Sequence, residues 1–325
     1  MRRRQFLPLA VGLAAAPLVP RAAFAWPDQP IKLVVPFTPG TGPDIIARFV
    51  AERLSPRLGQ PVVVENVAGA SGNIGSQQVA RAKPDGQTLM SSVNTLVMNA
   101  SLYKNLPYDP VADFAPLGLT AWGSLVLVAH PGQKPNTLGA LVAAAKAAPK
   151  TLTYGSPGVG TPHHLSMALV ETASGIELVH VPYKGTAGAV QDLLGDQIGY
   201  MFLPVHVSAP HIRAGKLKAI ATGSPQRLPQ LPDVPTLGES GLKGVDVDMW
   251  YGFFAPKGTP KDIVGKLNGA IVQALADPTV RGRFADLGLD VASREQQTPE
   301  GLAAFHKAEI EKWWPIIKAA NIKAE

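Results

Sequence analysis

The sequence predicts an α/β protein of two domains, built on parallel sheets with helices on both faces. Short apolar runs alternate with segments of helical periodicity, the order expected when a helix follows each strand of a parallel sheet. Turn-rich glycine loops join several strands to the next helix. The chain has 325 residues, 46% of them hydrophobic. At roughly 150 residues per domain, this is enough for about two domains, each with its own core.

The first strand–loop–helix unit sets the pattern. Residues 31–37 (IKLVVPF) are an apolar run that predicts a buried strand. Residues 38–43 (TPGTGP) form a turn-rich loop, and apolar residues recur at helical spacing after Asp44. The same order then returns: residues 60–65 predict a strand, and residues 66–75 a glycine loop with a helix onward to about residue 82. Residues 88–93 predict a third strand.

The middle of the chain repeats this alternation. Further strands are predicted at residues 122–130, 152–155, 177–181, 198–203 and 217–222. Helices are predicted at residues 138–148, 163–173 and 185–194. A glycine loop at residues 156–162 precedes one of these helices, with Thr161 suited to its cap and Pro162 to its first position.

The last part of the chain begins with an aromatic strand at residues 245–254. We expect a change of domain near the strand at 122–130 and a return through this aromatic strand. Its Trp250, Tyr251, Phe253 and Phe254 are expected in the core. Helices are predicted to follow at residues 262–276, 278–287 and 299–320.

The N-terminus predicts export. Arg2–Arg4 form a positive segment, residues 8–19 an apolar one, and Ala23-Phe24-Ala25 a cleavage site, so the mature chain should start at Trp26. The apolar segment is shorter than the ~20 residues that span a bilayer. Arg3-Arg4-Gln5-Phe6-Leu7 also resembles a twin-arginine export signal, and an ordinary Sec signal is the alternative. Residues 1–25 are therefore taken as a signal peptide of a periplasmic protein.

Charge and cysteine content exclude several functions. Residues 1–25 hold four arginines and no acidic residue, so their removal lowers the formal net charge from +6 to +2. Such a weak net charge does not indicate nucleic-acid binding. The chain has no cysteine, which excludes disulfides, thiolate zinc sites and a cysteine nucleophile.

Two glycine loops, at residues 38–44 and 156–164, predict an anion site. Each follows a buried strand and opens a helix whose first N–H groups have no intrahelical partner. A helix N-terminus carries about half a positive charge and binds carboxylate or phosphate without a lysine. A third such loop lies at residues 68–75. Tight connections are the alternative explanation of any one loop, and the matching design of all three favours binding.

Catalytic and metal-binding patterns are weak. The motifs G-x-S-x-G and G-x4-G-K-[ST] are absent, and Ser156 with His164 is the only nucleophile–base pair that the sequence offers. Six histidines lie between His130 and His211, without the spacing of a metal site. We expect one histidine to reach the ligand, no metal and no cofactor.

Three polar residues near these loops have two interpretations each. Asp44 at a helix start stabilises the helix dipole, or it contacts a ligand hydroxyl or amine. Tyr183 and Lys184 lie in a strand-to-helix turn that is either solvated or faces the ligand, where Lys184 would add charge for a carboxylate.

The chain resembles a known family in motifs that run in order along almost all of the mature sequence. The matching segments are WPDQPIKLVVPFTPGTGPDIIAR (26–48), GQPVVVENVAGASGNIG (59–75), AKPDGQTL (82–89), LYKNLPYDPVADF (102–114), YGSPGVGTPHHL (154–165), VPYKGTAGAVQDLLGDQI (181–198), LPDVPTLGESGL (231–242) and WYGFFAPKGTP (250–260). On these segments the protein resembles the Bug-type receptors of the tripartite tricarboxylate transporter family.

The resemblance implies a two-lobed periplasmic-binding-protein fold, similar to type II, with a ligand cleft between lobes joined by crossing hinge strands. It implies a first lobe of residues 26–122 and 248–325 and a second lobe of residues 123–247. It also implies a small carboxylate ligand, such as a dicarboxylate, an aromatic acid or an acidic amino acid. The partners would be integral-membrane transporter subunits or a sensor protein, the protein itself would not be an enzyme, and we expect a monomer.

The resemblance and the glycine loops together predict the ligand-binding residues. These are Phe37, Thr38, Gly40, Thr41, Gly42, Pro43, Asp44, Gly72, Ser156, Gly158, Gly160, Thr161, His164, Tyr183, Lys184, Pro204 and Val205. The first loop departs from the family pattern at Thr41, which adds a hydroxyl, and at Pro43, which removes a donor. Two alternatives remain at this stage: an exported α/β hydrolase or transferase using Ser156 and His164, and metal capture by the histidines.

Overall fold

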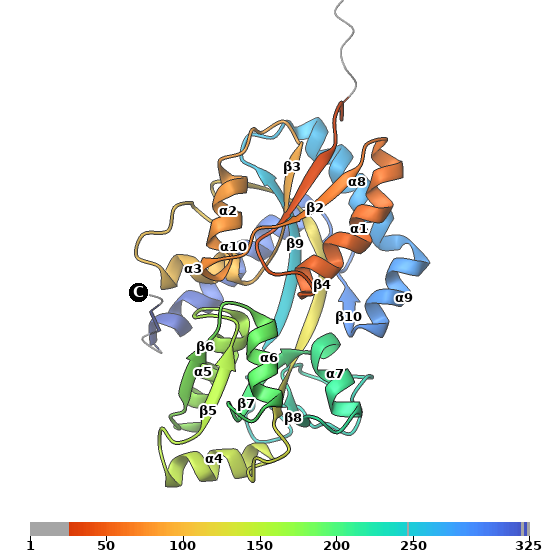
Figure 1. Ribbon diagram of the computed structural model, residues 1–325. Coiled ribbons are helices and arrows are strands. Elements are labelled where there is room, and N and C mark those ends of the chain that lie inside the picture. Colours follow the sequence, from red (N-terminus) through yellow and green to blue (C-terminus); the bar gives the residue numbers. More distant parts are fainter. Residues whose placement is uncertain (1–25, 246, 320–321, 324–325) are drawn as a thin grey trace, which may run out of the picture.

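The computed structural model describes residues 26–245, 247–319 and 322–323. The predicted signal peptide, residues 1–25, lies outside the described residues. Figure 1 shows two bodies of helices and strands stacked along the long axis of the molecule, joined by the strands β4 and β9. We call them the first lobe, which holds the two ends of the described chain, and the second lobe.

The first lobe is a sheet covered by helices on both faces. Its strands are β1 (Ile31–Val35), β2 (Val62–Asn66), β3 (Thr88–Val93), the first part of β4 (Phe114–Ala129), β9 (Asp248–Pro256) and β10 (Leu289–Val291). Its helices are α1 (Gly42–Leu58), η1 (Ala70–Gly72), α2 (Asn73–Ala80), α3 (Thr95–Leu102), α8 (Lys261–Ala276), α9 (Pro278–Asp286) and α10 (Pro299–Ala319). In Figure 1, α1, α8 and α9 lie on one side of this sheet and α2, α3 and α10 on the other.

The second lobe repeats the strand–helix alternation on a smaller sheet. Its strands are the second part of β4, β5 (Thr153–Ser156), β6 (Val179–Pro182), β7 (Tyr200–Pro204) and β8 (Lys218–Thr222). Its helices are α4 (Leu138–Ala147), α5 (Pro162–Ser174), α6 (Thr186–Leu194) and α7 (Val205–Arg213).

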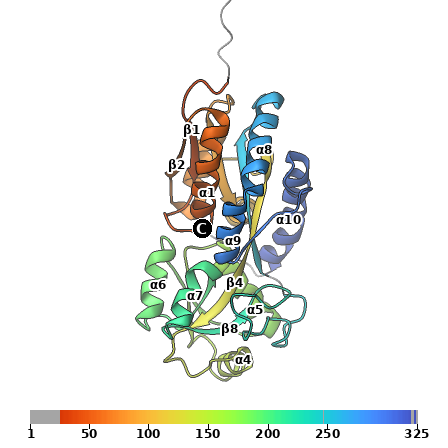
Figure 2. The same cartoon turned by 90° about the vertical axis from the view of Figure 1, so that its right-hand side faces the viewer.

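Strand β4 belongs to both lobes. The strand order is β2-β1-β3-β9-β4-β7-β5-β6, and β8 and β10 also pair with β4. Residues from Phe114 to Ser124 pair with β9, and residues from Leu125 to Ala129 pair with β7 and β8. Figure 2 shows β4 passing from one lobe into the other. The resemblance implied domain bounds at 122/123 and 247/248. These bounds stay a prediction, and the pairing partners of β4 change near the first of them.

Local sequence explains the first strand–helix unit. In β1, Leu33, Val34 and Val35 have no exposed surface, as in a parallel strand covered on both faces. Thr41 is extended at the start of α1, and Gly59 ends the helix at a φ of 71°. That left-handed conformation suits glycine because it has no Cβ.

The predicted α/β fold class is confirmed, with three differences in detail. The sheets are mixed, because β4 and β9 run antiparallel to their neighbours as the chain leaves and re-enters the first lobe. β4 begins at Phe114, before the predicted strand. The helices α3 and α7 and the strand β10 were not predicted at all.

The predicted aromatic core is confirmed. Trp250, Tyr251, Phe253 and Phe254 have no exposed surface. The carboxylate of Glu309, on α10, accepts hydrogen bonds from Trp250 Nε1 at 2.8 Å and Trp313 Nε1 at 3.0 Å. This buried acceptor fixes α10 against β9. In the described part of the chain, no helix has the length and apolarity needed to cross a bilayer.

Replacing Glu309 by alanine should destabilise the protein, because two buried indole N–H groups lose their acceptor. The expected loss is about 2–4 kcal/mol of unfolding free energy, measured by urea denaturation. Glu309→Gln keeps a carbonyl acceptor and should lose less, and Glu311→Ala, an exposed change on the same helix, should be nearly neutral. Equal stability of Glu309→Ala and Glu311→Ala would contradict the role given to this carboxylate.

Candidate ligand site between the lobes

A cleft between the two lobes encloses about 420 Å³. The first lobe contributes Thr38 and Thr41 from the β1–α1 loop and Gly72, the last residue of η1, from the connection between β2 and α2. The second lobe contributes Thr161 from the β5–α5 loop and Lys184 from the β6–α6 loop. Each loop follows the carboxyl end of a parallel strand, where open α/β sheets bind their ligands.

A smaller cavity adjoins the cleft and encloses about 40 Å³; we call it the inner chamber. The cleft and the inner chamber share the lining residues Phe37, Thr41, Pro157, Thr161 and Thr186. The other residues that line the inner chamber are Gly42, Pro43, Val93, Thr95, Pro162, His163, Pro204, His206, Val207 and Met249. Both lobes therefore build both cavities.

Five helices present their N-terminal ends to the inner chamber. Gly42 begins α1, Thr95 begins α3, Pro162 begins α5, Thr186 begins α6, and His206 is the second residue of α7. The first N–H groups of a helix have no partner within the helix and lie at the positive end of its dipole. The arrangement therefore attracts an anion from both lobes at once.

Cationic side chains contribute little to this attraction. Among the residues that the structure describes, Lys184 is the only lysine or arginine lining either cavity, and it is exposed in the outer cleft. The neighbouring Tyr183 donates its hydroxyl to Asp192 at 2.6 Å, so that group is already engaged. Hydroxyls, imidazoles and backbone N–H groups are left to make the polar contacts.

Asp44 holds the first glycine loop in place. Its buried carboxylate accepts from Gly40 N at 2.8 Å and Asn66 Nδ2 at 2.9 Å, and forms an ion pair with Arg48 at 2.9 Å. Burial alone would raise the pKa of this carboxyl, but the bonds from Arg48, Gly40 and Asn66 together lower it below its usual value. The carboxylate is thus matched to the chain's own donors, and it fixes the shape of the loop.

The second glycine loop lies in direct contact with the first lobe. Thr161 Oγ1 donates to the carbonyl of Gly158 at 2.8 Å, which closes the turn before α5. Across the cleft, Ser71 Oγ donates to the carbonyl of Val159 at 2.7 Å. The lobes therefore touch at this edge of the cleft, through backbone that adopts a φ of 149° at Gly158.

The inner chamber contains buried polar atoms without partners. His163 is 7% exposed, and neither of its ring nitrogens has a hydrogen-bond partner among the described residues. The same holds for His206 Nε2 and Thr95 Oγ1. Burial, with a smaller effect from His206, lowers the pKa of His163 to about 3. Burial also lowers the pKa of His206 to about 4, so both rings are neutral at neutral pH.

The structure divides the predicted ligand-binding residues into two groups. Those that line the cleft or the inner chamber are Phe37, Thr38, Thr41, Gly42, Pro43, Gly72, Gly158, Thr161, Tyr183, Lys184 and Pro204. Those that line neither cavity are Gly40, Asp44, Ser156, Gly160, His164 and Val205. A binding role for any of them stays a prediction.

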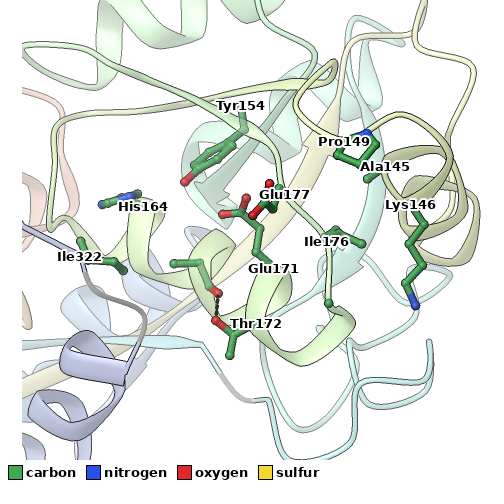
Figure 3. Close-up of a pocket in the computed structure, with 12 residues that line it drawn as sticks. Ala145, Lys146, Pro149, Tyr154, His164, Glu171, Thr172, Ile176, Glu177 and Ile322 are labelled. Carbon is green, nitrogen blue, oxygen red and sulfur yellow. Dashed lines mark hydrogen bonds between the residues drawn. The ribbon is translucent and has the colours of Figure 1, made fainter.

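His164 lines a different pocket, shown in Figure 3. That pocket encloses about 620 Å³, and Tyr154 and Glu171 face it as well. Most of its lining comes from the second lobe, and Ile322, which follows α10, completes it. His164 Nδ1 accepts from Gly160 N at 3.0 Å, and its ring stacks on His180 with centroids 4.0 Å apart. These contacts direct His164 away from the cleft. The adjacent residue, His163, is the one that lines the inner chamber.

The arrangement around Ser156 does not match the catalytic alternative. Ser156 Oγ lies 2.7 Å from His180 Nε2, a partner that the sequence did not suggest, and donates to the carbonyl of Gly158 at 3.0 Å. Ser156 has no exposed surface, whereas a nucleophile must reach its substrate. In the described ranges, no three His, Asp or Glu residues are grouped to hold a metal ion.

The polar residues of the inner chamber that were not predicted from the sequence are Thr95, His163, Thr186 and His206. All four lie in the first turn of a helix. A search for polar residues at every helix start could have found His163 and Thr186. Thr95 and His206 gave no such signal, because the helices that they begin were not predicted.

Two α/β lobes that share strands and close on an anion-attracting cleft define a two-lobed solute-binding protein. Residues 46–322 match the family described as "Tripartite tricarboxylate transporter family receptor". The chain belongs to this family, whose members are receptors and not enzymes, and the resemblance noted from the sequence is confirmed.

Known proteins similar to this chain agree with that assignment. The "UPF0065 protein in tcbD-tcbE intergenic region" of Pseudomonas sp. (strain P51) is 38% identical over 99% of this chain and 96% of its own length. The solved periplasmic binding protein BugD is 39% identical, with a TM-score of 0.86 over 92% of this chain and 99% of that chain. MatC (Rpa3494) from Rhodopseudomonas palustris, with bound malate, is 35% identical, with a TM-score of 0.85 over 90% and 100% of the two chains.

The buried histidines predict acid sensitivity. An unfolded histidine binds a proton near pH 6.5, whereas folded His163 stays neutral until about pH 3. The unfolded chain therefore binds more protons between these values, so the unfolding free energy should fall as pH drops from about 6.5 toward 4. Urea denaturation at several pH values should show this slope, and His163→Asn should reduce it by the contribution of one histidine, because the pKa values of His164, His180, His206 and His306 are also lowered by burial. Identical slopes in the two proteins would contradict the neutral state assigned to His163.

Proposed function

We propose that this protein captures a small carboxylate in the cleft between its lobes and delivers it to the membrane subunits of a tripartite transporter. The observation that carries the proposal is the convergence of five helix N-termini from both lobes on the inner chamber. Helix N-termini offer N–H donors and positive potential, the features that a carboxylate needs. Contacts from both lobes also mean that ligand binding would stabilise the closed arrangement.

The ligand class is supported by the chemistry of the lining and by one relative. The cleft of about 420 Å³ is within the usual size range of small-molecule pockets, about 300–1,000 Å³. MatC was solved with bound malate, which is a dicarboxylate. A dicarboxylate, an aromatic acid or an acidic amino acid is the ligand that we propose for this chain.

The same proposal includes export and partners. Residues 1–25 have the segments of a signal peptide that is cleaved after Ala25, and a similar solved protein is described as a periplasmic binding protein. The mature protein would work as a monomeric periplasmic receptor. Family membership supports integral-membrane transporter subunits as its partners.

A thermal-shift panel tests the proposal directly. The protein starting at Trp26 is heated with mono-, di- and tricarboxylates, aromatic acids, acidic amino acids and divalent metals. A ligand at 100 times its Kd adds about 2.7 kcal/mol of stability, which raises the melting temperature measurably. Stabilisation by one carboxylate class and not by metals is expected, and no shift with any carboxylate would refute the proposed function.

A charge reversal in the first loop should abolish carboxylate binding. Thr41 lines both cavities, so the carboxylate of Thr41→Glu would lie beside that of the ligand. Repulsion at about 4 Å in a partly buried site should lower affinity by at least about 100-fold, measured by isothermal titration calorimetry. Thr41→Gln has the same size without the charge and serves as the control. Similar affinities of the Glu and Gln variants would place the ligand elsewhere.

A further inference from the structure

Some residues that line the inner chamber have buried polar atoms that no described residue satisfies. His163 Nδ1 and Nε2, His206 Nε2 and Thr95 Oγ1 are buried and have no partner among the described residues. Buried polar groups are nearly always hydrogen-bonded, so each exception calls for a partner that binds there. The four atoms belong to residues that line one small cavity, so they are available to hydrogen-bond a polar group of a ligand that enters it.

The size and charge of the chamber limit what this group is. A water needs about 10–15 Å³ of such volume, so the chamber's volume of about 40 Å³ has room for one group of three heavy atoms, such as a carboxyl group. No lysine or arginine among the described residues lines it, and the remaining lining is mostly apolar. The five helix N-termini supply N–H donors and partial positive charge there, and a protonated imidazole would add the full positive charge that lowers the cost of burying a carboxylate further.

Among the residues that the structure describes, the two imidazoles are the only groups lining the chamber that can become positively charged. Both are neutral at neutral pH, because burial holds the pKa of His163 at about 3 and that of His206 at about 4. An adjacent carboxylate favours the charged imidazole and raises its pKa. Binding of a carboxylate there therefore brings a proton with it.

We propose that the inner chamber binds the second carboxyl group of a dicarboxylate, together with one proton shared with His163 and His206. The first carboxyl group would lie in the outer cleft, near the loops and Lys184. This inference rests on the proposed function and adds to it the ligand class, a dicarboxylate, and the residues that select it. Monocarboxylates of the same length would leave the chamber's nitrogens unpartnered.

Other ionisable groups around the chamber already have partners. On α1, Asp44 is paired with Arg48, and on α6, Asp192 accepts from Tyr183. On β9, Asp248 lies 3.4 Å from Ser124 Oγ. On α5, His164 faces the outer pocket. Lys184, on the β6–α6 loop, lies in the outer cleft. A change of protonation inside the chamber is therefore assigned to His163 and His206.

The test is calorimetric titration of the mature protein with malate, succinate and adipate, and with butyrate and hexanoate as monocarboxylate controls. Each titration is run in Mops and in imidazole buffer, which differ in ionisation enthalpy and are not phosphates or carboxylates, so the difference gives the protons taken up per ligand. Between pH 6.5 and 8 these dicarboxylates are fully ionised, so uptake reports the protein. We expect about one proton for a bound dicarboxylate, and an affinity that falls up to about tenfold per pH unit as pH rises.

Variants locate the proton. His163→Asn/His206→Asn keeps hydrogen-bonding groups but cannot be protonated, and should lose the proton uptake and at least about tenfold in dicarboxylate affinity at pH 6.5. His211→Asn, on α7 outside the chamber, is the matched control and should behave as the wild type does. Thermal melts without ligand check folding, and if the double variant does not fold, the wild-type proton count decides alone.

Each outcome bears on a different claim. A wild-type protein that binds a dicarboxylate without proton uptake would show that helix N-termini suffice, and would overturn the inference. Uptake that persists in the double variant would overturn the role of the two histidines. Binding of monocarboxylates only would overturn the dicarboxylate selection and leave the receptor function intact. Binding of no carboxylate would refute the proposed function, and this inference with it.

Discussion

The unpaired N–H groups at the beginnings of helices are the constraint on which the arrangement of this protein depends. In a parallel strand–helix order, each helix begins at the carboxyl edge of the sheet, and the two lobes turn these edges toward each other. The starts of α1, α3, α5, α6 and α7 consequently meet around one chamber. A potential built from backbone dipoles does not depend on any single side chain, so a weakly charged chain can attract an anion in this way. The short loops and the glycines serve the same end, because they let backbone approach the ligand closely.

Asp44 and His163 differ in whether the described residues satisfy their polar atoms. Both are buried polar residues near the start of a helix. Asp44 is fully engaged with Gly40, Asn66 and Arg48, so it contributes rigidity to the loop. The ring of His163 has no partner among the described residues, so its burial lowers stability unless something binds. Functional sites commonly carry such a cost, and the rest of the fold offsets it.

Much of the fold follows from the sequence, because alternation of strands and helices depends on local periodicity. The starts of α1 and α5, and the loops before them, were placed for this reason. The early part of β4 was missed because Pro116 and Gly118 interrupt its pattern, where the pairing with β9 also shifts register. Helix α7 was not predicted because Pro210 lies inside it, and proline normally interrupts a helix. The choice between His163 and His164 could not be made from spacing, because it depends on how α5 is rotated. That rotation is fixed by tertiary contacts, such as the stacking of His164 on His180.

The position of β9 has a consequence for how the chain assembles during synthesis. β9 lies between β3 and β4 in the sheet, yet the ribosome makes it only after every element of the second lobe. Until it emerges, β3 and the first part of β4 are open edges that invite pairing with other chains. The second lobe, by contrast, has all of its strands by the end of β8. During synthesis, the second lobe thus has all of its strands first. The first lobe, which contains the start of the described chain, can complete its sheet only when β9 has been made.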